Sequence, residues 1–254
     1  EMLEPNHIHA NLEPISITNT RYENTDVWQI DFGKNFTGFL DLSIAGNPGD
    51  TIQILSSDLD IDAVRYKQIS KLVLNNSGNG RFTHKYNYCA GRYVTLVGKI
   101  EKPKNENLRA LAISNNRKQI GYFQSSNQLL NQIFETDRWT YLANTLSGYT
   151  VDCPHRERRG YGAEGAMAGI FCALPLYESG AFLGKWLQDW RDAQEVTGRF
   201  PHIAPTDSPR DPGGGPWYSA APVHLTYYYY LYYKDKEILK KNYPGIKHWL
   251  EFLN

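Results

Sequence analysis

The sequence has few cysteines, no excess of charge of either sign and no long apolar run, and each shortage excludes a class of protein. The three cysteines, Cys89, Cys153 and Cys172, are odd in number and lack the spacing of metal ligands. This argues against a disulfide framework and against a zinc site. The cysteines do not fix the cellular compartment.

The charge balance argues against two kinds of partner. Among the 254 residues, Lys and Arg number 27, and so do Asp and Glu. Binding a polyphosphate backbone or an anionic membrane surface requires a basic excess, so nucleic acid is not expected as a partner. No stretch approaches the roughly 20 apolar residues of a membrane span. We therefore expect no membrane span.

What the chain does have is a globular composition rich in aromatic rings. Hydrophobic residues make up 41% and charged residues 21%, which is enough for one large core or two ordinary ones. The chain contains 6 Trp, 18 Tyr and 10 Phe. Such flat, amphipathic rings pack well in cores and also stack on sugar faces. The enrichment is compatible with a carbohydrate-active protein without establishing one.

The first part of the chain has the pattern of short strands. Between Asp26 and Ile113 apolar residues alternate or cluster in short runs, punctuated by Gly, Asn, Pro and Asp. Pro48-Gly49 and Asn79-Gly80 are turn signals. The pattern predicts an antiparallel β-sandwich over residues 1–118, an accessory domain in which no catalytic constellation is evident.

The second part, residues 119–254, has the pattern of helices. The composition turns polar and basic at 115–119, and beyond it the apolar period changes from two toward 3.6. Residues 125–127 offer an N-cap for a first helix that carries an apolar stripe from Leu129 to Leu146. We expect a stacked array of five helices, of which the later four cover about 162–177, 179–195, 220–233 and 236–253.

A long loop interrupts these helices. Residues 198–217 hold five prolines and four glycines, too many for periodic structure. A loop of this length inside a compact domain is usually functional or disordered, and its His, Arg, Asp and Trp residues favour a function. Asp207, Asp211, Trp217 and Tyr218 are candidate pocket walls. For the two aspartates, solvated loop residues are an equal alternative, whereas Trp217 follows three glycines and is well suited to stacking.

Residues 149–165 concentrate the chemistry, because three carboxylates, three arginines and a histidine lie in one irregular stretch. Inverting hydrolysis of a glycosidic bond needs a protonated carboxyl beside the leaving oxygen and an ionised one that positions water, roughly 6.5–9.5 Å away. A neighbouring arginine keeps an acid ionised and an aromatic wall keeps it protonated. Arg156, Arg158 and Tyr161 supply both kinds of neighbour.

The segment DCPHRERRGYGAEG closely resembles the signature of the α-L-rhamnosidases of glycoside hydrolase family 78. In that signature Asp-Cys-Pro-x-Arg-Glu leads into a Gly-aromatic pair and then another acid. VWQIDFGKNFTGFLDLSIAGNPGDTIQI and GRYVTLVG resemble the sandwich that precedes the family's catalytic domain. HIAPTDSPRDPGGGPW and NYPGIKHWLEFL resemble later catalytic segments. The first motif is the most specific of these.

The resemblance implies roles for three acids. Asp152, Glu157 and Glu164 fall on the acids of the family's sugar subsite, with Glu157 as the general acid. Glu164 stands where the family commonly has Asp, so its exact contact is open. The family's general base is a Glu much further along, which we expect beyond residue 254. The family's catalytic domain is an (α/α)6 barrel, of which this chain would hold the first part, and the reaction needs no cofactor and no metal.

Each assignment has a structural alternative. Glu157 could be a surface acid paired with Arg156 or Arg158, and Asp152 could cap the turn before Pro154. Glu164 could be a first-turn helix acid favoured by the helix dipole. Arg156 could bind the sugar or orient an acid. His155 is better explained by a structural role, and Cys153 by packing.

We therefore expect a glycoside hydrolase that removes terminal α-L-rhamnose from an oligosaccharide, polysaccharide or other glycoside. Two alternatives remain: a helical-toroid glycosidase for another sugar, and a non-catalytic carbohydrate-binding protein. The chain begins at Glu1 and stops inside an amphipathic pattern, so we interpret it as a fragment. The compartment stays open, with a periplasmic or extracellular location compatible with the sequence.

Overall fold

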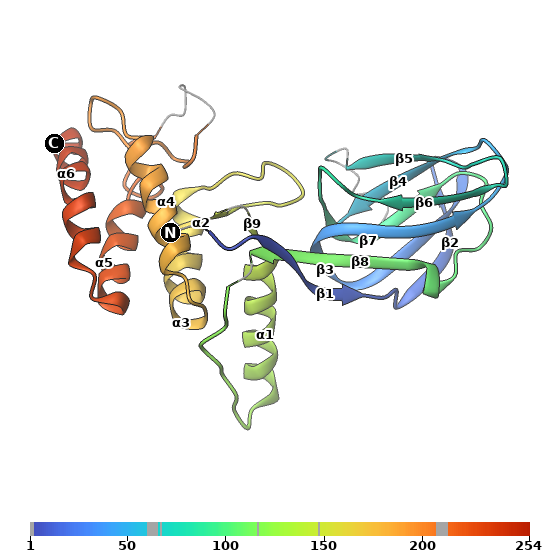
Figure 1. Ribbon diagram of the computed structural model, residues 1–254, viewed down its shortest axis with the longest axis horizontal. Coiled ribbons are helices and arrows are strands. Elements are labelled where there is room, and N and C mark those ends of the chain that lie inside the picture. Colours follow the sequence, from blue (N-terminus) through green and yellow to red (C-terminus); the bar gives the residue numbers. More distant parts are fainter. Residues whose placement is uncertain (1–2, 60–65, 67, 116, 147, 207–212) are drawn as a thin grey trace. The chain divides into compact units, whose positions relative to one another are not determined.

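The computed structural model describes residues 3–59, 66, 68–115, 117–146, 148–206 and 213–254. The chain divides into two compact units. The sheet unit comprises His7–Ser114 with Pro154–Arg156, and the helical unit comprises Glu1–Asn6, Asn115–Cys153 and Glu157–Asn254. In Figure 1 the strands of the sheet unit run from blue to green, and the helices run from green to red.

The sheet unit is built from eight strands hydrogen-bonded into one sheet, in the order β1-β8-β3-β7-β4-β5, with β2 and β6 also paired to β3. A short 3-10 turn, η2 (Asn105–Asn107), precedes the last strand. The strands are β1 (Asn6–Leu12), β2 (Ser16–Tyr22), β3 (Thr25–Ala45), β4 (Thr51–Ser57), β5 (Ile69–Val73), β6 (Asn79–Thr83), β7 (Cys89–Val97) and β8 (Leu108–Asn115).

The long strand β3 curls this sheet. It pairs antiparallel with β2 through its first residues, with β8 through its middle and with β6 through its end. A register shift between Asp31 and Phe36 interrupts its pairing with β7, and Gly33 there has a φ of +82°. The predicted antiparallel β architecture is confirmed at this coarse level, as one curled sheet.

The core of the sheet unit follows the alternation seen in the sequence. Ile30, Leu40 and Leu42 of β3 are fully buried, and their neighbours along the strand are more exposed. This is the period of two that places alternate side chains on one face. Gly38 lies between β7 and β8, where a β-carbon would stand 1.9 Å from the Leu111 carbonyl oxygen. Only glycine, which has no β-carbon, lets β3 pair this closely with β7 and β8.

The helical unit begins with α1 (Gln128–Ala143), whose cap is the one expected within residues 125–127. The Asn127 side chain accepts a hydrogen bond from the Leu129 N–H at 2.9 Å. The hairpin β9 (Thr145–Leu146) and β10 (Tyr149–Thr150) follows. The remaining elements are α2 (Gly162–Ala168), the π turn η3 (Gly169–Ala173), α3 (Leu174–Leu176), α4 (Gly180–Asp192), α5 (Ala221–Tyr233) and α6 (Lys236–Leu253).

The helical stretch expected over 162–177 is confirmed within one residue, because α2, the π turn and α3 follow one another without a break from Gly162 to Leu176. The sequence did not indicate the π turn, which lies just before Pro175. Proline lacks the N–H of a regular helical hydrogen bond and its ring crowds the preceding turn, so a wider turn at this position suits it. The helix expected over 179–195 is shorter, ending at Asp192. The last two helices match their expected bounds within one residue.

An aromatic core connects the helices to the long loop. The rings of Trp186, Trp190, Phe200 and Trp249 follow one another with centroid separations of 6.0, 6.2 and 6.3 Å. The Trp186 Nε1–H donates to the Ala204 carbonyl at 2.6 Å. The start of the loop is therefore fixed to α4 by both packing and a buried hydrogen bond.

Candidate active site

The motif segment leaves β10 as a closed loop. The Asp152 N–H donates to the Arg159 carbonyl at 3.0 Å, and the Arg159 N–H donates to Asp152 Oδ1 at 3.1 Å. Inside this pair, the Arg158 N–H donates to the Cys153 carbonyl at 3.2 Å, and Arg158 has a left-handed φ of 59°. The loop is thus irregular, as the sequence indicates, and its two ends are held together by Asp152.

The loop brings Asp152, Cys153 and Glu157 together, and we call these three residues the acid cluster. A carboxylate oxygen of each acid and the Cys153 Sγ lie within 4.8 Å of one another. Burial alone raises the pKa of Asp152. Hydrogen bonds with Glu157 and from the Cys153 and Arg159 N–H groups outweigh burial, so this pKa lies below its ordinary value. Asp152 is therefore the ionised member of the pair.

The hydrogen bond between the two carboxyl groups needs one proton, because two carboxylates have no donor to share. The hydrogen bond with Glu157 contributes to the lowered pKa of Asp152. Two neighbouring carboxyls in different surroundings can take separate roles in acid–base chemistry. The alternative of Asp152 as a cap also holds, since it closes the loop through Arg159.

Cys153 takes part in the acid cluster, so the expectation of a small buried packing residue is wrong. Burial and the negative charge of Asp152 raise the pKa of the Cys153 thiol to about 12, and hydrogen bonds to Asp152 and Glu157 add to the effect. The thiol therefore keeps its proton and donates it toward the acids. Sequence reasoning missed this role, and the only available signal was the position of Cys153 directly after Asp152.

The acid cluster is also the group of side chains in the described ranges that could converge on a cation. Carboxylates suit hard cations such as Mg²⁺ and Ca²⁺, whereas a thiol suits softer metals, so this mixed set of three donors matches neither class well.

Glu164 lies in the first turn of α2, is exposed, and is not a member of the acid cluster. It occupies the dipole-favoured position considered as its structural alternative. Arg156 and His155 are counted with the sheet unit. There, His155 Nε2 lies 3.9 Å from the Asp58 carboxylate, and the Arg156 guanidinium carbon lies 5.5 Å from the Tyr66 ring centroid.

The far end of the motif is joined to the long loop. The Gly162 N–H donates to the His202 carbonyl at 2.9 Å, and the Ala204 N–H donates to the Gly160 carbonyl at 3.0 Å. A β-carbon on Gly162 would stand 2.0 Å from the Tyr218 carbonyl oxygen. The two motif glycines therefore permit a close approach between backbone segments about 40 residues apart in sequence.

Three rings gather at this junction. The Tyr218 ring centroid lies 5.6 Å from that of Tyr161 and 5.1 Å from that of His202. Trp217, the next residue along the loop, is 69% exposed. The loop thus places an aromatic wall beside the end of the motif. Sequence reasoning named Tyr218 and Trp217 as candidates but gave His202 no role, while Asp207 and Asp211 lie outside the described residues.

Both halves of the chain match known protein families. Residues 118–254 match the bacterial alpha-L-rhamnosidase 6 hairpin glycosidase domain, and residues 21–114 match the bacterial alpha-L-rhamnosidase concanavalin-like domain. The first match alone covers more than half of the chain. The chain therefore belongs to the bacterial α-L-rhamnosidase family.

Individual relatives agree with this placement. An alpha-L-rhamnosidase from Formosa agariphila is 26% identical over 250 residues, covering 89% of this chain and 26% of its own length. The structure of an alpha-L-rhamnosidase from Dictyoglumus thermophilum superposes with a TM-score of 0.88 at 26% identity, covering 100% of this chain and 29% of its own. A Streptomyces avermitilis alpha-L-rhamnosidase in complex with L-rhamnose gives 0.85 at 25% identity, covering 99% and 25%.

The chain spans about a quarter of the length of these relatives. Among the residues described, no helix combines the length and apolar character needed to cross a membrane.

Proposed function

We propose that this chain carries the proton-donating half of the active site of an inverting α-L-rhamnosidase, with Glu157 as general acid. The observation that supports this most is the acid pair, in which oxygens of the two carboxyl groups lie within 4.8 Å of each other and the hydrogen bond with Glu157 contributes to the lowered pKa of Asp152. A general acid must hold its proton until the glycosidic oxygen departs. In this proposal the proton is on Glu157, beside the anionic Asp152.

In this mechanism Glu157 donates its proton to the glycosidic oxygen as the C–O bond breaks. Asp152 stays ionised and accepts hydrogen bonds from the sugar hydroxyls. Water attacks the opposite face of the sugar, activated by a second carboxylate roughly 6.5–9.5 Å from the acid. We place that general base beyond residue 254, in a part of the enzyme that this chain does not contain.

The substrate is a terminal α-L-rhamnoside of an oligosaccharide, polysaccharide or other glycoside. The names of the relatives support this choice, as does the rhamnose bound to one of them. Rhamnose carries a methyl group where most hexoses carry a hydroxymethyl, so an aromatic wall of Tyr161, Tyr218 and Trp217 offers it a suitable apolar contact. Arg156, Glu164 and Asp211 complete the proposed sugar contacts.

The helices are proposed to be the first part of an (α/α)6 toroid. The exposed apolar side chains of α1 support this, because Leu129, Leu130 and Ile133 are 62, 46 and 52% exposed. Only Tyr141, Leu142 and Ala143, at the end of α1, are buried. A stripe with helical period and no partner is typical of a helix that packs against further helices.

The test is the Glu157→Gln variant of the intact enzyme, assayed on two substrates. A nitrophenol leaves with little help, whereas a sugar needs the proton, so the variant should lose about 10²–10⁴-fold in kcat on a rhamnosyl disaccharide and far less on the nitrophenyl rhamnoside. The matched control is Glu178→Gln, because Glu178 is a surface acid paired with Lys118 at 3.3 Å. Equal losses on both substrates would assign Glu157 to sugar binding or structure.

A panel of nitrophenyl glycosides tests the sugar. Preference for the α-L-rhamnoside is the expected result. Turnover confined to another glycoside would favour the alternative of a toroid glycosidase with a different specificity.

A further inference from the structure

A groove crosses the end of strand β3 in the sheet unit, far along the chain from the motif. Its main hollow has a volume of about 320 Å³. A smaller hollow of about 130 Å³ continues it, sharing Ser43, Ile44, Ala45 and Asn107, and the rest of its lining includes the charged residues Glu101, Lys102 and Lys104. The main hollow is lined by Ser43, Ile44, Ala45, Asn75, Asn79, Gly80, Arg81 and Asn107. Its volume lies at the lower end of the range for small-ligand sites.

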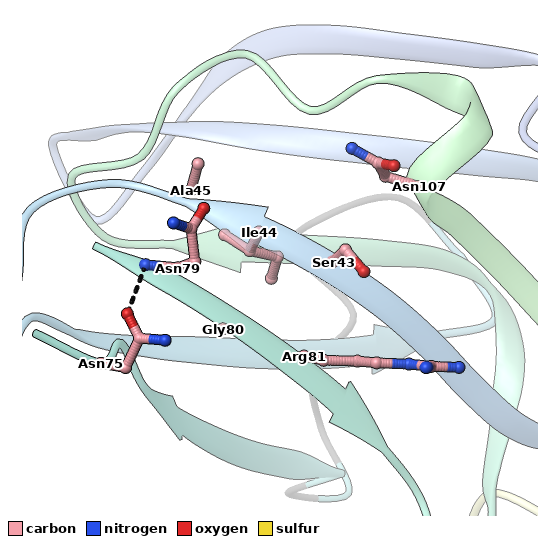
Figure 2. A pocket seen from close by; sticks show the side chains of 8 residues that line it. All are labelled: Ser43, Ile44, Ala45, Asn75, Asn79, Gly80, Arg81 and Asn107. Atoms are coloured by element: carbon pink, nitrogen blue, oxygen red, sulfur yellow. Dashed lines mark hydrogen bonds between the residues drawn. The ribbon is translucent and has the colours of Figure 1, made fainter. Parts of the chain in front are cut away.

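The lining is rich in side-chain amides. Figure 2 shows Ser43 and Ile44 on β3, with Asn107 on one side of them and Asn75, Asn79 and Arg81 on the other. An amide both donates and accepts hydrogen bonds, as does a hydroxyl. The small residues Ala45 and Gly80 and the buried Ile44 leave room between these polar groups.

Hydrogen bonds hold the side-chain amides of Asn75 and Asn79 in place, and some amide groups of the hollow remain free. Asn75 Oδ1 accepts from the Ser77 N–H at 2.9 Å and from the Asn79 N–H at 3.0 Å, which fixes the turn before β6. Within the described part of the sheet unit, the Asn75 Nδ2 group and the side chain of Asn107 make no hydrogen bond. These groups are free to bind a ligand.

The one charged residue that lines the main hollow carries no free charge. Arg81 Nε and Nη2 donate to the two Asp41 carboxylate oxygens at 2.9 and 2.8 Å. The hydrogen bonds from Arg81 keep the pKa of Asp41 below its ordinary value, so this ion pair persists at neutral pH. A wall of amides and a neutralised arginine favours an uncharged, hydroxyl-rich ligand over an anion.

We propose that the main hollow of this groove binds a neutral saccharide of one or two units, as a second carbohydrate site separate from the acid cluster. The inference rests on the lining of the groove and does not require that Glu157 act as a general acid. Few hydrogen bonds and an open surface should make the binding weak, with a dissociation constant of about a millimolar.

The test is a titration of the 254-residue chain carrying Ile133→Lys, which interrupts the exposed apolar face of α1 that favours self-association, followed by amide NMR. The probes are the methyl glycosides of L-rhamnose, D-galactose, D-glucose and D-mannose, with D-galacturonate as an anionic comparison. At least one neutral probe should shift the side-chain amide signals of Asn75, Asn79 and Asn107 in a saturable way. Galacturonate should shift them less.

Asn107→Ala should weaken this binding about three- to tenfold, the usual effect of one hydrogen bond. The matched control is Asn105→Ala, which removes an exposed amide from the same 3-10 turn outside the groove. Glu157→Gln should leave the groove shifts unchanged. Retained signal dispersion shows that each variant is folded.

Each of the following results would overturn the proposal: no saturable shift of the groove amides with any neutral probe, equal weakening by both asparagine variants, or binding of galacturonate alone. Shifts confined to residues 152–157 would also overturn it while leaving the proposed active site intact. If the groove binds a saccharide but the Glu157→Gln variant of the enzyme keeps full activity, the proposed active site fails and the groove proposal stands. The two proposals therefore fail separately.

Discussion

At the scale of single residues, the acid cluster depends on the groups that keep Asp152 ionised. Asp152 is stabilised as an anion by two N–H donors and by the hydrogen bond with Glu157. The Cys153 thiol keeps its proton and donates it toward the same carboxylates. The loop therefore surrounds Asp152 with hydrogen-bond donors, which favour its ionised form.

The first residue-scale prediction concerns the reactivity of Cys153. A rise of the thiol pKa from 9.0 to about 12 lowers the thiolate fraction at pH 8 about a thousandfold. Iodoacetamide should therefore label Cys153 at least tenfold more slowly than a free thiol, measured by peptide-resolved mass spectrometry. Asp152→Asn should accelerate labelling, because it removes the negative neighbour, whereas the distant Glu178→Gln should not. An unchanged rate in Asp152→Asn would contradict the described contact.

The second concerns Asp31 in the sheet unit. Arg92 Nε and Nη2 each donate to its carboxylate at 2.7 Å, and the Gly33 N–H donates to it at 2.7 Å. The hydrogen bond from Arg92 lowers the pKa of Asp31 despite burial. Asp31→Asn should therefore reduce the free energy of unfolding by about 2 kcal/mol at pH 7, as for charge-assisted hydrogen bonds.

A carboxyl group with a lowered folded-state pKa stabilises the protein above its ordinary pKa, here 3.8, and loses this contribution as the pH falls through the folded value. The difference between wild type and Asp31→Asn should thus shrink below about pH 4, measured by urea unfolding. Asp26→Asn is the control, since its 3.6 Å pair with Arg21 is largely solvent-exposed. If the difference in the free energy of unfolding between wild type and Asp31→Asn did not change with pH, the charge of the Asp31 carboxylate would not be the source of the stabilisation.

At the scale of elements, the apolar period and the capping residues predicted the features that depend on residues close in sequence. The Asn127 cap and the bounds of α5 and α6 follow from side chains close in sequence. The π turn after Ala168 and the 21-residue length of β3 do not, because packing against distant segments decides them. The same holds for the site. The family resemblance singled out Asp152 and Glu157 but not their contact with each other, and that contact and the role of Cys153 needed the folded loop.

The element-scale prediction concerns the junction of the motif with the long loop. Gly162→Ala would place a β-carbon 2.0 Å from the Tyr218 carbonyl oxygen, and backbone cannot rotate away as a side chain can. We expect a loss of about 1–3 kcal/mol in the free energy of unfolding, measured in urea. The control is Gly215→Ala, where a β-carbon meets nothing within 4 Å. Equal stability of the two variants would mean that the junction is looser than described.

At the scale of the whole molecule, the chain combines an acid pair with helix faces that lack partners. Leu129, Leu130 and Ile133 of α1 are exposed, and so are Tyr227, Leu231 and Tyr232 of α5. The amphipathic period predicted the α1 stripe but not which of its side chains are buried in this chain. Which of its side chains are buried depends on elements outside α1, and the sequence of the helix cannot specify them.

The last prediction is that the 254-residue chain alone does not hydrolyse nitrophenyl α-L-rhamnoside and self-associates. A chain that holds the general acid but not the general base lacks the carboxylate that activates water. Exposed apolar helix faces favour association in water. Ile133→Lys on α1 should therefore reduce the apparent mass in light scattering, whereas Gln132→Lys, at an exposed polar position beside it, should not. Turnover by the purified monomeric chain would place the general base within these residues, and a monomer without any substitution would mean that the α1 face needs no partner.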